Sequence, residues 1–133
     1  MTDHVARLVA ESEIRRTIAD YCHSCDDGRF DDFALCFAPD AVVVLGGKVV
    51  ASGRTAIQAW IEKGQPPDKR GKHVTVNSLV TIDGAEARGA TDFVFVARTP
   101  DGPQVTTAGR YLDMFAPYGD RWLFTSREIQ LLR

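Results

Sequence analysis

Asp26 and His73 are the two residues of this sequence whose side chains could together carry out proton-transfer chemistry. A neutral imidazole can take a proton from a carbon next to a carbonyl group. A carboxylate on the other ring nitrogen fixes the tautomer and stabilises the imidazolium as it forms. An apolar enclosure strengthens such a pair because its effective dielectric constant is lower than that of water. If the two side chains meet, the sequence predicts an enzyme with a His–Asp dyad.

Each residue also has a simpler interpretation. Asp26 comes just before Gly28, which predicts the end of a helix, and a carboxylate there opposes the helix dipole. That cost favours a functional reason for Asp26, although aspartate is also common in turns. His73 could be a strand-edge histidine that faces solvent. The residues alone leave both interpretations open.

Cys22 and Cys25 have the Cys-x-x-Cys spacing of zinc and redox sites. No second ligand pair follows at zinc-site spacing. The pair lies at the end of a predicted helix, where the helix dipole raises a thiol pKa rather than lowering it. We interpret these cysteines as small packed side chains, and the sequence predicts no metal and no cofactor.

Length and charge exclude several classes of protein. The chain has 133 residues, 44% of them hydrophobic, and a net charge of -2, which fits a single domain over residues 1–133 without affinity for nucleic acid or membrane. No segment resembles a secretory signal, and three cysteines suit a reducing compartment, so we expect a cytoplasmic protein. The densest basic patch, 69–72, is interpreted as part of a solvated loop, 64–72, that borders a pocket.

The expected elements are helices first and strands later. Hydrophobic spacing predicts a long helix over 3–26, a short helix over 30–37 that Pro39 ends, and a third helix capped by Thr55. A hairpin is expected at 41–45 and 48–52, and four neighbouring antiparallel strands at 74–82, 87–98, 105–115 and 121–132. This order predicts an α+β fold in which helices pack on one face of a curved sheet.

Several short motifs occur in a specific order and spacing. They are Ile14–Arg16 with Tyr21, Asp26–Asp31, Phe37–Ala41, Gly53–Ile57, His73–Val74, Gly109–Asp113 and Arg121–Trp122. In this pattern the chain resembles the NTF2-like superfamily, specifically SnoaL-like proteins of the scytalone dehydratase type. The resemblance implies a cone-shaped, mixed or antiparallel sheet wrapped around the long N-terminal helix, with two shorter helices and one apolar cavity. It also implies a homodimer or higher homo-oligomer.

The resemblance also suggests an activity. In lyases of this type a histidine is the base and an aspartate orients it, and His73 and Asp26 match those positions. The implied function is a cofactor-independent dehydratase or isomerase that acts on a small apolar hydroxy or keto compound. This chain departs from the pattern at Cys25, where the family has a tyrosine, and at Ala97 and Arg98, near the place of a second histidine. These departures argue against scytalone as substrate and leave the group that polarises the carbonyl unidentified.

Five further residues are candidates for substrate binding. They are Tyr21, Asn77, Asp92, Arg110 and Arg127. Strand alternation would place Asn77 on the same face as His73, from where its amide could bind a substrate oxygen. The three charged residues interrupt apolar strands, and the favoured alternative for each is an exposed or ion-paired position in the sheet. For Tyr21 the favoured alternative is core packing.

A second function remains open. The chain could be a non-catalytic SnoaL-like module that holds a small ligand, or an accessory subunit such as the β subunit of an aromatic-ring dioxygenase. The fold is compatible with both functions, so the choice depends on the site. If His73 and Asp26 lie apart or outside the cavity, binding or assembly is the better prediction.

Overall fold

The computed structural model describes residues 3–133 and contains three α-helices, one short 3-10 helix and six strands. The helices are α1 (Asp3–Asp27), α2 (Phe30–Ala34) and α3 (Arg54–Gly64), and the 3-10 helix η1 spans Pro67–Lys69. The strands are β1 (Phe37–Leu45), β2 (Lys48–Ser52), β3 (Lys72–Asp83), β4 (Glu86–Thr99), β5 (Gly102–Tyr118) and β6 (Arg121–Leu131). The α+β class expected from the sequence is therefore confirmed.

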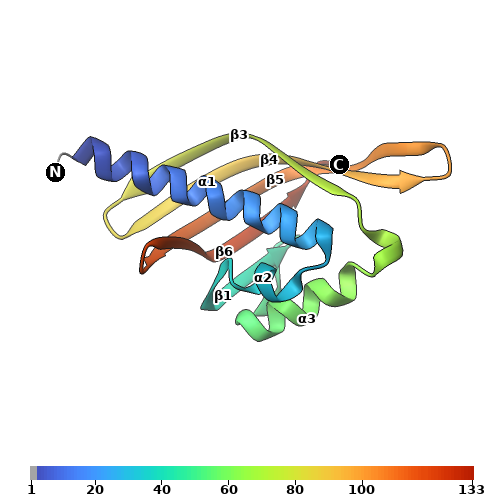
Figure 1. Ribbon diagram of the computed structural model, residues 1–133, viewed down its shortest axis with the longest axis horizontal. Helices are drawn as coiled ribbons and strands as arrows, with labels where there is room; N and C mark the ends of the chain where they lie inside the picture. The colour runs from blue at the N-terminus through green and yellow to red at the C-terminus, as the bar shows by residue number, and fades with distance from the viewer. Residues whose placement is uncertain (1–2) are drawn as a thin grey trace.

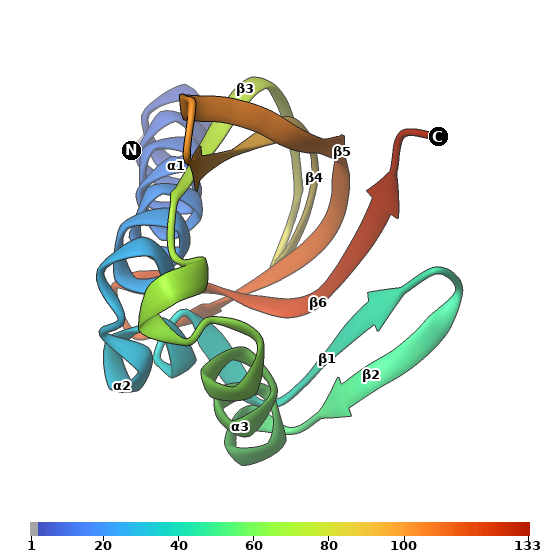
Figure 2. The same cartoon turned by 90° about the vertical axis from the view of Figure 1, so that its right-hand side faces the viewer.

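One curved sheet contains all six strands, in the order β2-β1-β6-β5-β4-β3. Neighbouring strands are antiparallel except β1 and β6, which run parallel, so the sheet is mixed. Helix α1 crosses the sheet along its length, and the sheet curls around that side of the molecule (Figures 1 and 2). The short connections predicted between the last four strands produce the long antiparallel half of the sheet.

Helix α1 packs one face against the inside of this curve. Its buried residues include Ile14, Ile18, Tyr21 and Cys25, which recur at helical spacing. The main partners from the sheet are aromatic: Phe37, Phe93, Tyr111, Phe115 and Phe124. The core therefore lies between α1 and the concave face of the sheet.

Gly28 ends α1 as predicted. Its φ of 72° lies in the left-handed region, and the backbone N–H groups of Gly28 and Arg29 donate to the carbonyls of Cys25 and Ser24. This is the Schellman arrangement, which satisfies carbonyls that the last helical turn leaves free. The chain then reverses into α2, and Asp26 is held in the last turn of α1.

Two local predictions were wrong. The second helix ends at Ala34 rather than continuing to residue 37, because Phe37 already belongs to β1 and pairs with Phe124 of β6. Gly53, not Thr55, is the N-cap of α3, with a φ of 90° and no side-chain capping bond. At Phe37, pairing with the distant strand β6 overrides the local helix signal. At Gly53, the backbone N–H donates to the Ala41 carbonyl oxygen of β1, and the helix begins at the next residue.

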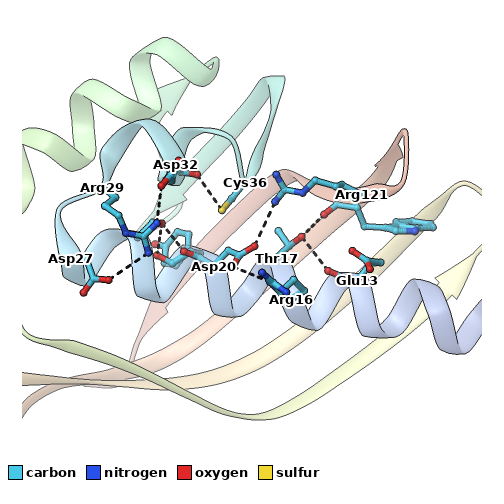
Figure 3. Close-up of polar contacts among 12 residues, drawn as sticks. Glu13, Arg16, Thr17, Asp20, Asp27, Arg29, Asp32, Cys36 and Arg121 are labelled. Atoms are coloured by element: carbon cyan, nitrogen blue, oxygen red, sulfur yellow. Dashed lines mark hydrogen bonds and ion pairs between the residues drawn. The ribbon is translucent and has the colours of Figure 1, made fainter.

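Polar contacts attach α1 to α2 and to the start of β6 (Figure 3). The Thr17 hydroxyl donates to the Trp122 carbonyl oxygen at 2.5 Å, and Asp20 lies between Arg16 and Arg121. Arg29 pairs with Asp27 and Asp32 across the turn. These contacts fix the C-terminal half of α1, including Asp26, relative to the sheet.

None of the helices between residues 3 and 133 combines the length and the apolar character needed to cross a bilayer.

Candidate active site

The structure brings Asp26 and His73 together, although they are 47 residues apart in the sequence. His73 Nδ1 lies 2.6 Å from Asp26 Oδ1, and the backbone N–H of His73 donates to Asp26 Oδ2 at 2.9 Å. The side chains are 12% and 5% exposed. One carboxylate therefore holds both the backbone and the ring of His73. Since it accepts from Nδ1–H, the basic lone pair lies on Nε2.

Two backbone features place the dyad. Asp26 lies in the last turn of α1, next to the fully buried Cys25. His73 is the second residue of β3, opposite Phe95 of β4. Just before it, a Cβ at Gly71 would be 2.1 Å from the Val96 carbonyl oxygen, so glycine allows the two strands to approach here. The imidazole is thereby presented from a rigid strand.

A cavity of about 560 Å³ opens next to the His73 ring. Tyr21 of α1 contributes to its lining, as do side chains from α3, η1, β4, β5 and β6. Its apolar lining consists mainly of Trp60, Ile61, Phe93, Phe95, Tyr111, Ile129 and Leu131. Asp26 does not line the cavity and lies behind His73. Nε2 makes no hydrogen bond within residues 3–133, so it is the ring nitrogen available to a bound molecule.

A buried ion pair supports one wall of the cavity. Arg127 and Asp113 face each other on β6 and β5, and Nε and Nη2 of the arginine donate to the carboxylate at 2.8 and 3.1 Å. The guanidinium carbon lies 3.5 Å from the ring centroid of Tyr111 and 4.2 Å from that of Tyr21. Arg127 is fully buried and does not line the cavity. It acts on the site through the two tyrosines that do.

Burial raises the pKa of Tyr21 above its ordinary value, although the nearby Arg127 guanidinium acts in the opposite direction. The pKa of Tyr111 is raised for the same main reason. Both hydroxyls therefore stay protonated at neutral pH and can donate a hydrogen bond. Tyr21 lies with its ring edge-on to His73, at a centroid distance of 6.3 Å.

The prediction that Asn77 shares a face with His73 was wrong. The β3–β4 register shifts between Val76 and Leu79, and Asn77 at this bulge has a φ of 57°. A bulge inserts one extra residue and so reverses the alternation beyond it. The Asn77 amide instead donates to Asp92, which also pairs with Arg110 at 2.6 Å. This exposed cluster lies outside the cavity that His73 lines.

The cysteines are buried and free, as packed side chains would be. Burial raises the pKa of Cys25 to about 12 and that of Cys22 to about 11. Ligand atoms of Cys25, Asp26 and His73 lie within 4.8 Å of one another. A metal there would need the Cys25 thiolate, and both Asp26 oxygens are already bound to His73. The arrangement therefore suits proton transfer better than metal binding.

Most of the residues that form the cavity were not predicted from the sequence. Tyr111 and Phe93 stack with their ring centroids 4.2 Å apart, and Arg70 borders the mouth. The loop 64–72 was expected to border a pocket, and Lys69 and Arg70 of its basic patch line the cavity. Phe93 and Tyr111 lie in strands that were predicted, yet no local signal distinguishes a cavity wall from a packed core.

Comparison with known proteins agrees with this architecture. The model of the SnoaL-like domain family matches residues 6–128. A search of curated proteins returned no match. Rv3472(D26N), a protein of unknown function from Mycobacterium tuberculosis, superimposes with a TM-score of 0.92 at 24% identity, over 100% of this chain and 78% of the other. An NTF2-like protein with a cystatin-like fold from Novosphingobium aromaticivorans gives 0.88 at 23% identity, over 97% and 86%.

A third similar structure carries a functional description. It is a protein from Novosphingobium aromaticivorans described as a "Putative Scytalone Dehydratase", with a TM-score of 0.83 and 24% identity, covering 96% of this chain and 87% of the other. Identities at this level establish the shared fold, which is the NTF2-like cone. They leave the activity to the site itself.

Proposed function

The chain belongs to the SnoaL-like domain family, and on that basis we propose that it is a cofactor-independent lyase or isomerase. Its substrate is a small, mostly apolar hydroxy or keto compound. The single observation that carries the proposal is the 2.6 Å contact between Asp26 and His73, with the imidazole lining a cavity of about 560 Å³. A cavity of this size suits a small organic molecule.

The proposed reaction needs one base and no added group. His73 Nε2 takes a proton from the carbon next to the substrate carbonyl, and Asp26 stabilises the imidazolium that forms. In a dehydration the same nitrogen returns the proton to a β-hydroxyl group, which leaves as water while the new double bond forms. In an isomerisation the proton returns to another carbon of the substrate. Tyr21, protonated and lining the cavity, is the proposed donor to the carbonyl oxygen.

The proposal is tested by following carbon-bound protons in D2O. Small β-hydroxy ketones are first screened for binding to the protein, and those that bind are incubated with it and monitored by proton NMR. We expect loss of the signal of the proton next to the carbonyl, or appearance of the unsaturated ketone, faster than in buffer alone. Bound ketones that neither exchange nor lose water would contradict the proposal.

A non-catalytic binding or accessory role is the competing function. One of the similar folds is the β subunit of a "putative aromatic-ring-hydroxylating dioxygenase", with a TM-score of 0.78 at 20% identity, over 97% of this chain and 94% of the other. The departures at Cys25 and Ala97 from the residues of scytalone dehydratase also favour it. This role predicts ligand binding without proton exchange, which is the contradictory outcome of the same experiment.

We propose further that two copies associate through the outer face of the sheet. Apolar side chains on that face are exposed, among them Leu79 at 75% and Val76 at 49%. A groove of about 460 Å³ crosses it between Leu79, Leu112 and Met114. Apolar area of this kind is typical of surfaces that another protein covers.

Leu79→Glu should convert a wild-type homodimer to a monomer, because the carboxylate would be desolvated in the interface. Sedimentation velocity measures the change. Val105→Glu, at the distal end of the β4–β5 hairpin, is the matched control and should leave the dimer intact. A monomeric wild-type protein, or a Leu79→Glu variant that stays dimeric, would contradict the proposal.

A cytoplasmic location is proposed as well. Its support is the set of three buried, free cysteines, Cys22, Cys25 and Cys36, which a reducing compartment preserves.

A further inference from the structure

The mouth of the cavity carries an excess of positive charge. Lys69 and Arg70, from the segment after α3, and Arg98, from β4, line the cavity, and the exposure of Lys69 and Arg98 places this group at its open side. Asp68 is the one acidic residue among the side chains that line the cavity. The charge of the whole chain is -2, so this excess is opposite in sign to that of the protein.

These three cations have no acidic partner in the part of the chain that the structure describes. Within residues 3–133, none of them takes part in an ion pair, whereas Arg16, Arg29, Arg110, Arg121 and Arg127 all do. Cations left without partners around a partly enclosed space create a positive potential that favours anionic molecules. The charge alone does not identify which residue would contact the anion.

Arg70 is the cation that the fold holds in place. Its Nε donates to the Gln65 carbonyl oxygen at 3.1 Å, and its guanidinium lies 5.3 Å from the ring centroid of Phe30. The group also packs against Gly28, where a Cβ would be 2.5 Å from Cζ. One of the five N–H donors of the guanidinium is therefore used, and its two terminal nitrogens make no hydrogen bond within residues 3–133.

The rest of the cavity is largely apolar. The inner walls include Phe93, Phe95, Tyr111 and Ile129, and Trp60 lies on the side of α3. A ligand that satisfies both regions has an apolar body and one negative charge at its end. Two parallel N–H groups of an arginine match the two oxygens of a carboxylate.

We propose that the cavity binds an anionic amphiphile, a small acid with an apolar ring or chain, and that Arg70 binds its acidic group at the mouth. This inference deepens the proposed function by defining its substrate as a hydroxy or keto acid. Lys69 and Arg98 add charge at the entrance without fixing the ligand.

The test is binding of two fluorescent probes with similar ring systems, measured without turnover. They are 8-anilinonaphthalene-1-sulfonate, which is anionic, and N-phenyl-1-naphthylamine, which is uncharged. Wild-type protein should bind the anionic probe about tenfold more tightly. Arg70→Met should remove most of that difference and leave binding of the uncharged probe within about twofold, while Arg70→Lys should retain part of the preference.

Two further variants make the result decisive. Arg15→Gln removes an exposed arginine of α1 that does not line the cavity and should leave both affinities unchanged. Ala97→Trp fills the cavity and should abolish binding of both probes. Equal affinity for the two probes, an equal loss of both in Arg70→Met, or unimpaired binding to Ala97→Trp would overturn the proposal. Because no reaction is measured, a preference for the anion stands even if the D2O experiment detects no exchange.

Discussion

Replacing His73 with alanine is expected to lower kcat by about 10²- to 10⁴-fold on any substrate that the wild-type enzyme converts. The variant lacks the nitrogen that takes and returns the proton, while the apolar cavity wall is largely kept. The effect should appear in kcat more than in KM, since Nε2 acts on the reacting carbon and contributes little to ground-state binding. Steady-state kinetics, with circular dichroism to establish folding, measure it.

Asp26→Asn should cause a loss of similar size for a different reason. Both oxygens of Asp26 accept N–H donors from His73, one from the ring and one from the backbone. An amide has one oxygen, so it satisfies one donor and turns an N–H group toward the other. If its NH2 group faces Nδ1, the ring proton moves to Nε2 and the base is lost. The nitrogen-15 chemical shifts of the ring report this change of tautomer directly.

Asp27→Asn is the matched control because it makes the same chemical change one residue along. The Asp27 side chain is 49% exposed and pairs with Arg29 across the turn (Figure 3). The kcat of the Asp27→Asn variant should remain within about twofold of wild type, since an exposed ion pair contributes little to stability. Folded His73→Ala and Asp26→Asn variants that turn over substrate at the wild-type rate would eliminate the dyad mechanism.

Asp113→Asn is expected to cost about 3–5 kcal/mol of the free energy of unfolding. Arg127 is fully buried, and its Nη1 already lacks a hydrogen-bond partner within residues 3–133. Burial disfavours the charged form of Arg127, but the Asp113 carboxylate more than offsets this, and the pKa of the guanidinium is raised. An arginine guanidinium is not deprotonated inside proteins, so Arg127 stays charged in the variant, which leaves an unpaired charge among aromatic rings.

Urea unfolding, followed by the fluorescence of Trp60 and Trp122, measures this loss. The double variant Asp113→Leu/Arg127→Met removes both charges and should recover most of the stability. Removing one member of a buried ion pair destabilises a protein more than replacing both members by apolar residues. Asp20→Asn, which disturbs the exposed pairs of Asp20 with Arg16 and Arg121, should change stability by less than about 1 kcal/mol. An Asp113→Asn variant as stable as the Asp20→Asn control would contradict the conclusion that the buried Arg127–Asp113 pair stabilises the fold.

The Arg127–Asp113 pair also has a consequence for the site. Its guanidinium packs against the rings of Tyr21 and Tyr111, which line the cavity. The Asp113→Asn variant should therefore loosen the part of the cavity wall that Tyr21 and Tyr111 form, as well as destabilise the fold. Stability and cavity shape depend here on the same buried contact.

The elements of the fold were largely predictable because their signals are local. Helical spacing from Val5 to Cys25 and the glycine at 28 predicted α1 to within one residue at its end. The β-branched runs separated by short turns predicted the hairpin at 41–52 and the last four strands. The parallel pairing of β1 with β6, which overrides the helix signal at Phe37, depends on residues far apart in the chain and had no local signal.

The candidate site was predictable in part. A carboxylate at a helix end and a lone histidine at a strand start were visible in the sequence, and the resemblance linked them. Arg127 was noted as a charge in an apolar strand, but its burial depends on Asp113, which lies opposite it in the neighbouring strand. The loop that contains Arg70 was expected to border a pocket, but no local pattern shows which of its side chains line the cavity.

Residue order along the chain was enough to identify the elements and the two groups able to move a proton, because backbone preference and hydrophobic spacing act over a few residues. Folding in three dimensions decided their 2.6 Å separation, the bulge that turns Asn77 outward and the cationic mouth. Each of these depends on contacts between segments that meet when α1 packs into the curved sheet. Distances of that kind are set by the packing of the whole core, which no short stretch of sequence specifies.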